Sequence, residues 1–266
     1  MISAYPIRTL KGTVMDTTRR LALLIDGDNA QAALLPEMLA EVNKYGTATI
    51  RRVYGDWTEP QMKGWKEALN VYALQLIQQF RYTKGKNATD SALIIDAMDI
   101  LYTAGIDGFC LVSSDSDYTR LATRIREMNL FVMDIGREAT PRPFVDACNV
   151  FVYTENLVKS VKAPDESAAS SAADQPPGKA LSSKDARALK KLLTAAFELA
   201  VQDDGWATLA TMGSFLRQLD PAFDPRTYGH SQLSQLVEAH PQIIEVKKIQ
   251  SRNNTSVYYM RMRAKG

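Results

Sequence analysis

A short apolar run that stops at two carboxylates constrains this fold more than any other feature. Residues 21–25 read Leu-Ala-Leu-Leu-Ile, and Asp26, Gly27, Asp28 and Asn29 follow directly. An uninterrupted apolar run of this length is typical of a strand buried on both faces, as in a parallel sheet. Ligands of open α/β sheets bind at the carboxyl ends of the strands. The run therefore predicts an α/β fold with both aspartates at its functional edge, although Asp-Gly is also common in turns.

A second apolar run ends in the same way. Residues 108–112 form a short buried strand in this interpretation, and residues 113–118 read Ser-Ser-Asp-Ser-Asp-Tyr. Between the two runs, Thr89 is an expected helix N-cap, which places Asp90 in the first turn of an apolar helix. A carboxylate there also favours the helix dipole, so Asp90 has a purely structural explanation as well.

These three motifs carry a resemblance to a known family. Over about residues 20–157 the chain resembles the NYN domain of the PIN-like nuclease superfamily. The resemblance implies a PIN-like parallel sheet flanked by helices, and hydrolysis of RNA phosphodiesters with a divalent metal. The resemblance assigns four metal ligands: Asp26, Asp90, Asp115 and Asp117. It also assigns Asn29 to orient a ligand or a substrate phosphate.

Elementary electrostatics favours the same site. Two carboxylates about 4 Å apart repel by roughly 4 kcal/mol at an effective dielectric constant near 20, so several together need a cation. Oxygen ligands suit Mg²⁺ or Mn²⁺ better than zinc. The only two histidines, His230 and His240, lie far downstream, which excludes a histidine base from this domain.

The remaining elements of this domain and its RNA contacts follow from local patterns. Strands are expected over 47–54, 72–80, 130–135 and 149–153, and helices over 31–45, 60–70, 118–128 and 141–147. The basic segment 81–87 precedes Asp90, so Lys84 and Lys86 could contact an RNA backbone and Tyr82 could stack on a base. An ordinary solvated loop is the alternative. Arg137 could likewise reach a phosphate or form a surface salt bridge.

Composition marks a linker and a second domain. Residues 161–183 are rich in Ala, Ser, Pro and Asp, and we expect a flexible linker there, after a domain over 20–160 and an N-terminal arm over 1–19. Residues 184–266 pattern as three helices and a β-hairpin, which together make a small winged-helix domain.

The second domain resembles the OST-HTH/LOTUS domain over about residues 186–262. Gly-Trp-Ala at 205–207, Leu-Asp-Pro-Ala-Phe at 219–223 and the closing hairpin carry the resemblance. It implies RNA binding, including G-rich RNA, and contacts with protein partners. Residues 181–266 hold 12 Lys and Arg against 8 Asp and Glu. Three basic residues of the hairpin are candidate RNA contacts or a solvated face: Lys247, Lys248 and Arg252.

Overall composition limits the cellular setting but not the partner. The chain has 32 Lys and Arg against 30 Asp and Glu, a net charge of +2, which says little about partners. No apolar segment is long enough for a membrane helix, and charges interrupt the first 20 residues, so we expect neither a membrane span nor a signal peptide. Cys110 and Cys148 fall in apolar segments and are expected to be core thiols in a reducing cytoplasm.

The sequence therefore predicts a cytoplasmic, metal-dependent ribonuclease domain joined to an RNA-binding winged helix. One alternative is a non-catalytic RNA-binding or assembly adaptor that keeps the acidic edge without turnover. Another is a phosphatase of the haloacid dehalogenase type. Such enzymes use a nucleophile and an acid that are two aspartates two positions apart, and Asp26 and Asp28 have the same spacing. That chemistry usually continues into Thr or Val two residues after the second aspartate, and this chain has Ala30 there.

Overall fold

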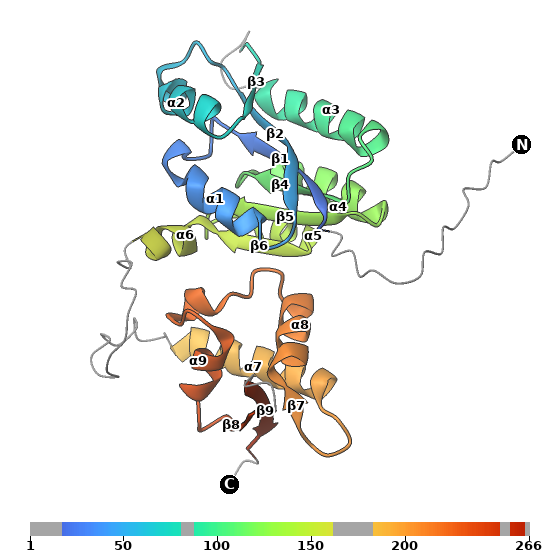
Figure 1. The fold of residues 1–266 in the computed structure, drawn as a ribbon, viewed down its shortest axis with the longest axis vertical. Helices are drawn as coiled ribbons and strands as arrows, with labels where there is room; N and C mark the ends of the chain where they lie inside the picture. The colour runs from blue at the N-terminus through green and yellow to red at the C-terminus, as the bar shows by residue number, and fades with distance from the viewer. Residues whose placement is uncertain (1–17, 81–87, 162–182, 251–255, 264–266) are drawn as a thin grey trace, which may run out of the picture.

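The computed structural model describes residues 18–80, 88–161, 183–250 and 256–263. They form an N-terminal domain built on a parallel sheet and a smaller C-terminal domain (Figure 1). None of the helices in these four ranges combines the length and apolar character needed to cross a bilayer.

The N-terminal domain is organised around one six-stranded sheet with all strands parallel. Its strand order is β3-β2-β1-β4-β5-β6, so the chain builds outward from β1 in one direction and then from β4 in the other. The order reverses between β1 and β4, which makes their carboxyl ends the topological switch point where α/β folds bind ligands. The strands are β1 Arg20–Asp26, β2 Thr47–Gly55, β3 Gln75–Gln78, β4 Gly108–Val112, β5 Phe131–Gly136 and β6 Val150–Tyr153.

Helices cover both faces of the sheet because the apolar run of β1 supplies two cores (Figure 1). Alternate strand residues point to opposite faces. Leu21, Leu23 and Ile25 pack on the side of α1, α2 and α6, whereas Ala22 and Leu24 pack on the side of α3, α4 and α5. The helices are α1 Leu35–Val42, α2 Lys63–Val71, α3 Ala88–Thr103, α4 Thr119–Glu127, α5 Arg142–Ala147 and α6 Thr154–Val161, with short 3₁₀ turns at Ala32–Leu34, Pro60–Met62 and Ser116–Tyr118.

The C-terminal domain has its own hydrophobic core, formed by three helices and a small antiparallel sheet of order β7-β9-β8. The hairpin β8–β9 lies at the end of the molecule away from the parallel sheet (Figure 1). The elements are α7 Ser183–Ala200, β7 Ala207–Thr208, α8 Leu209–Leu219, a 3₁₀ turn Pro225–Tyr228, α9 Leu233–Glu238, β8 Ile244–Gln250 and β9 Ser256–Met262.

The structure confirms the predicted parallel α/β fold and adds elements that the patterns missed. Helix α6 follows β6 directly, and the two-residue strand β7 precedes α8 and pairs with β9. The Thr208 hydroxyl accepts a hydrogen bond from the Thr211 amide at 3.2 Å, so α8 begins after a Thr208 N-cap. Helix α3 begins at Ala88, so the expectation that Thr89 is its N-cap is wrong. Cys110 and Cys148 are buried free thiols, as expected.

Candidate metal and catalytic site

Three aspartates from two separate segments of the chain converge at the switch point of the sheet. Carboxylate oxygens of Asp90, Asp115 and Asp117 all lie within 4.8 Å of one another. Asp90 comes from the first turn of α3, and the other two come from the loop and 3₁₀ turn that follow β4. We refer to these three aspartates, together with Asp26 and Asp28 at the end of β1, as the acidic cluster.

Local hydrogen bonds hold the loop after β4 in place. The Ser113 hydroxyl accepts a bond from the Asp115 amide at 3.1 Å, and the Asp115 carboxylate accepts one from the Asp117 amide at 2.9 Å. Asp115 is therefore the N-cap of the 3₁₀ turn, and the cap leaves its second carboxylate oxygen for the cluster.

Asp26 lies at the base of the cluster and is completely buried. Its Oδ2 accepts hydrogen bonds from Asn29 Nδ2 at 2.7 Å and from Ser113 Oγ at 3.0 Å. Its Oδ1 is buried with no hydrogen-bond partner in the described residues. Burial raises the pKa of Asp26 to about 6; the Asn29 hydrogen bond opposes this rise, and repulsion from Asp90 adds to it. Asp26 lies outside the group of three but is electrostatically coupled to it.

Asp28 joins the cluster through Thr89. The Thr89 hydroxyl donates a 2.9 Å hydrogen bond to Asp28 Oδ2, and repulsion from Asp28 contributes to the raised pKa of both Asp26 and Asp90. Gly27, between Asp26 and Asp28, allows the end of β1 to lie directly against β2. A Cβ there would lie only 2.8 Å from the Tyr54 carbonyl oxygen, a contact that a side chain cannot make without displacing β2.

Tyr118 fixes the orientation of Asp90. Its buried hydroxyl donates a 2.7 Å hydrogen bond to Asp90 Oδ1. Burial, followed by repulsion from Asp26, raises the pKa of this phenol, so it remains a neutral donor. The pKa of Asp90 is itself raised by burial, lowered in part by the Tyr118 hydrogen bond, and raised again by Asp115 and Asp117.

Arg137 lies beside the acidic cluster. One of its guanidinium nitrogens is 3.4 Å from the Asn29 carbonyl oxygen, and its amide donates to Ser114 Oγ at 2.8 Å. In the ranges that the structure describes it forms no salt bridge, so the surface ion pair considered as an alternative is not observed. Four other predicted RNA contacts lie outside the described residues: Tyr82, Lys84, Lys86 and Arg252.

Lys247 and Lys248 lie on the exposed strand β8 and not near the acidic cluster. The Lys247 ammonium is 6.0 Å from the centre of the Trp206 ring, and the Lys248 ammonium is 5.4 Å from that of Tyr258. The Arg261 guanidinium lies 4.9 Å from the same Trp206 ring. The hairpin thus combines cations with aromatic rings, an arrangement common on nucleic-acid-binding surfaces.

Fold and cluster together define a class: a doubly wound parallel sheet that gathers carboxylates at its switch point. The family model of the NYN domain matches residues 20–157, more than half of the chain, and that of the OST-HTH/LOTUS domain matches residues 180–255. The chain therefore belongs to the NYN domain family, with an OST-HTH/LOTUS domain following. The two families together indicate a nuclease with an RNA-binding module.

Three solved structures are similar to part of this chain. A crystal structure of a protein of unknown function from Vibrio parahaemolyticus is 19% identical, with a TM-score of 0.44, over 53% of this chain and 96% of that one. An uncharacterised protein from Nitrosomonas europaea is 30% identical over 39% and 94%, with a TM-score of 0.29. A protein fragment from Chromobacterium violaceum is 36% identical over 29% and 83%, with a TM-score of 0.25. Comparison with curated proteins gives no match.

Proposed function

We propose that this protein is a metal-dependent ribonuclease that hydrolyses RNA phosphodiester bonds. The observation that carries the proposal is the group formed by Asp90, Asp115 and Asp117, whose carboxylate oxygens lie within 4.8 Å of one another at the ligand-binding edge of an NYN fold. Both cysteines are buried free thiols, which fits a reducing compartment such as the cytoplasm.

The residues present fit a divalent cation with oxygen ligands, Mg²⁺ or Mn²⁺. Five carboxylates belong to the acidic cluster, and their mutual repulsion contributes to the raised pKa of both Asp26 and Asp90. The buried Oδ1 of Asp26 lacks a hydrogen-bond partner. A cation would satisfy this oxygen and offset the mutual repulsion of the carboxylates.

In this proposal Asp26, Asp90, Asp115 and Asp117 hold the metal. When bound, a divalent cation lowers the pKa of water and offsets charge on the scissile phosphate. Asn29 and Ser113 orient the Asp26 carboxylate through their hydrogen bonds, and Tyr118 orients Asp90.

Charged groups around the cluster would position the RNA. Arg137 lies beside Asn29, where its guanidinium can contact a phosphate oxygen. We also assign phosphate contacts to Lys84 and Lys86 and base stacking to Tyr82. The C-terminal domain would hold RNA on its hairpin through Lys247, Lys248 and Arg252, and its covalent tether would raise the local concentration of RNA at the nuclease site.

A cleavage assay on labelled RNA tests the proposal. With Mn²⁺ or Mg²⁺ the protein should cut the RNA, and EDTA should abolish cutting. Asp90→Asn should lower the rate by at least about 100-fold, the typical loss when a key electrostatic group is removed. Asp99→Asn is the matched control, because Asp99 is exposed on the same helix and outside the acidic cluster.

Two outcomes would contradict the proposal. If the protein binds RNA but cuts it with neither metal, the non-catalytic adaptor is the better description. If Asp90→Asn and Asp99→Asn cut RNA equally well, the acidic cluster is not the active site.

A further inference from the structure

A polar cleft lies between the two domains, away from the acidic cluster. It has a volume of about 760 Å³. The N-terminal domain contributes residues at the amino ends of its strands, among them Arg19, Phe131 and Val150, and helix α8 of the C-terminal domain forms the other wall. The acidic cluster lies at the carboxyl ends of the strands, so the cleft and the cluster lie at opposite ends of the strands.

Arginine dominates the lining of this cleft. Four arginines face it against a single carboxylate, that of Asp146, and all four are exposed to solvent. We call this feature the arginine cleft; its arginines are Arg19, Arg126, Arg142 and Arg217.

Three of the four guanidinium groups retain donors for a ligand. Arg142 is paired with Asp146 at 2.8 Å and with Asp220 at 3.0 Å. Arg126 donates one bond to the Asp146 carbonyl at 2.8 Å, which leaves other N–H groups of its planar fork. Within the described ranges, neither Arg126 nor Arg19 nor Arg217 forms a salt bridge.

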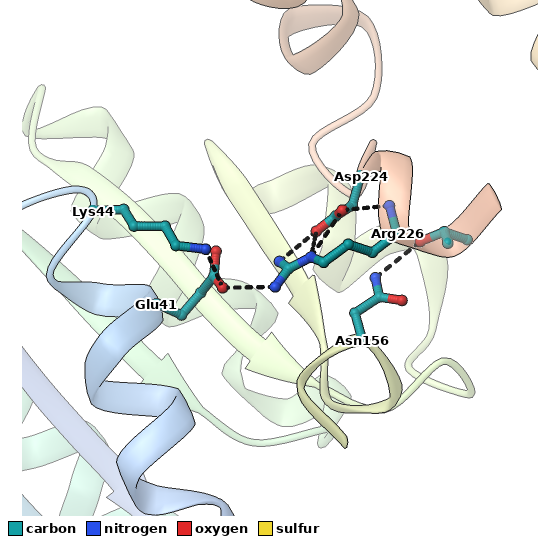
Figure 2. Close-up of polar contacts among 6 residues, drawn as sticks. Glu41, Lys44, Asn156, Asp224 and Arg226 are labelled. Atoms are coloured by element: carbon teal, nitrogen blue, oxygen red, sulfur yellow. Dashed lines mark hydrogen bonds and ion pairs between the residues drawn. The ribbon is translucent and has the colours of Figure 1, made fainter. Parts of the chain in front are cut away.

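A partly buried ion pair joins the two domains. Arg226 of the C-terminal domain bonds to Glu41 of α1 at 3.0 Å, and only 5% of the Glu41 side chain is exposed. Figure 2 shows this carboxylate between Arg226 and Lys44, and shows Asp224 paired with the same Arg226 guanidinium. In the same view Asn156 of α6 reaches the C-terminal domain through a 2.9 Å hydrogen bond to Thr227.

Backbone and apolar contacts extend this interface up to the cleft. The Phe151 amide of β6 donates a 2.8 Å hydrogen bond to the Pro221 carbonyl, so the loop after α8 caps the edge of the parallel sheet. Ala222 is buried within the hydrophobic core on the α3, α4 and α5 side of that sheet. Arg217 on α8 and Arg126 on α4 thus face one cleft across a fixed interface.

We infer that the arginine cleft binds the phosphodiester backbone of single-stranded RNA at a site separate from the acidic cluster. This inference rests on the proposed RNA function of the two domains. Guanidinium forks match phosphate oxygens in pairs, and a basic groove lined by few carboxylates is how proteins follow a nucleic-acid backbone. The volume of the cleft exceeds that of one phosphate, and both domains contribute cations to it.

The two sites lie about one strand length apart. Strand β1 spans the sheet from Arg20 to Asp26, and six steps of about 3.3 Å give roughly 20 Å. A single RNA strand stacked at about 3.4 Å per nucleotide covers this distance with about six nucleotides, so one short RNA can reach both sites.

The test measures RNA binding without cleavage, in EDTA, with a fluorescent single-stranded RNA of about 20 nucleotides. Arg126→Gln combined with Arg217→Gln should raise Kd at least about tenfold. It should also reduce the slope of log K against log salt by about 1.4, because each lost phosphate contact on a single strand removes about 0.7. The matched control is Arg124→Gln combined with Arg187→Gln, which changes the net charge equally at exposed arginines on α4 and in the C-terminal domain outside the cleft.

Equal losses of affinity in the two double variants, or no loss in either, would overturn the inference. So would an acidic peptide of matched charge that binds the parent as tightly as RNA and loses the same factor in the Arg126/Arg217 variant. Thermal unfolding of both variants confirms that they fold. If the parent never cuts RNA but the cleft variant alone loses binding, the nuclease proposal fails and the cleft stands. If the parent cuts RNA while the two double variants bind RNA equally well, the inference about the cleft is wrong and the nuclease proposal stands.

Discussion

The phenol of Tyr118 donates a 2.7 Å hydrogen bond to Asp90, so a buried residue after β4 fixes a carboxylate carried by α3. Both residues belong to elements that meet at the switch point of the sheet. Because Tyr118 is a neutral donor, it lowers the cost of ionising Asp90 without neutralising it. In the proposed metal site, this contact would hold the carboxylate in a fixed orientation for the cation.

Tyr118→Phe should therefore weaken Mn²⁺ binding about 10- to 100-fold, the usual cost of losing a partner that orients a metal ligand. Isothermal titration calorimetry measures the change. Tyr54→Phe is the matched control, since Tyr54 is a buried tyrosine that bonds to Asp96, a residue of the same helix outside the acidic cluster. The control should lose stability but keep its Mn²⁺ affinity. Equal loss of affinity in both variants would mean that Tyr118 acts through the fold alone.

The pKa of Asp26 predicts an inverted pH dependence of stability in the metal-free protein. The folded protein raises this pKa from 3.8 to about 6, so folding favours the protonated carboxyl. The contribution is fully present below pH 3.8 and is lost as the pH rises through 6. At about 1.4 kcal/mol per pKa unit, ionisation of Asp26 costs roughly 3 kcal/mol above that pH.

Asp26→Asn should consequently stabilise the metal-free protein at pH 7.5 and not at pH 4. We expect a gain of about 1 kcal/mol rather than the full amount, because the new amide N–H would replace Oδ1, which has no partner. Urea unfolding in EDTA at both pH values measures it. Asp107→Asn is the opposite control: Arg20 hydrogen bonds lower the Asp107 pKa, so this variant should lose stability at pH 7.5. A loss for Asp26→Asn at pH 7.5 would show that its ionised form is not disfavoured.

The sheet and the positions of its carboxylates could be predicted because each depends on local pattern. The apolar run before Asp26 and the run before Asp115 each specify a buried strand, and parallel strands must end at one edge. The partners of those carboxylates could not be predicted. Tyr118 and Ser113 stand inside the recognised motif, yet their partners depend on tertiary packing. The contact of Tyr118 with Asp90 depends on how α3 packs near the end of β4, and that of Ser113 with Asp26 depends on the pairing of β4 with β1.

Features that combine residues from distant segments could not be predicted from local patterns. The arginine cleft joins residues from Arg19 to Pro221, and no spacing rule brings these together. Similarly, Asp-Pro-Ala-Phe at 220–223 identified the OST-HTH/LOTUS domain but gave no sign that Ala222 enters the core of the other domain. Helix α6 was missed because it starts immediately after β6, without a turn to mark its beginning.

Arg226→Gln should destabilise the protein by about 1–3 kcal/mol. Removing Arg226 leaves the buried Glu41 carboxylate without its main partner, and Lys44 at 2.8 Å would compensate this charge only in part. Arg261→Gln is the matched control, because its 2.8 Å pair with Glu245 is about half exposed and should be worth less than about 1 kcal/mol. Urea unfolding measures both variants. A cost for Arg226→Gln no larger than that for Arg261→Gln would show that this pair does not hold the domains together.

The hairpin lysines should contribute to RNA affinity through phosphate charge. Lys247 and Lys248 are exposed on β8, an outer strand of the small sheet, and each lies beside an aromatic ring. Successive strand residues point to opposite faces, so an RNA that follows this outer strand meets both side chains. Lys247→Gln combined with Lys248→Gln should reduce the salt slope of RNA binding by about 1.4 and weaken binding to all single-stranded sequences similarly. Fluorescence anisotropy at a series of salt concentrations measures this slope.

Lys190→Gln combined with Lys191→Gln separates a binding surface from general charge. These lysines are also adjacent and exposed, but they lie on helix α7 of the same domain and not on the hairpin. They remove the same charge, so a long-range electrostatic effect would lower the affinity equally in both double variants at low salt. Direct contact predicts a change of slope for the hairpin pair alone, because only contacted phosphates release their counterions. Equal slopes in the two variants would place the RNA elsewhere on the domain.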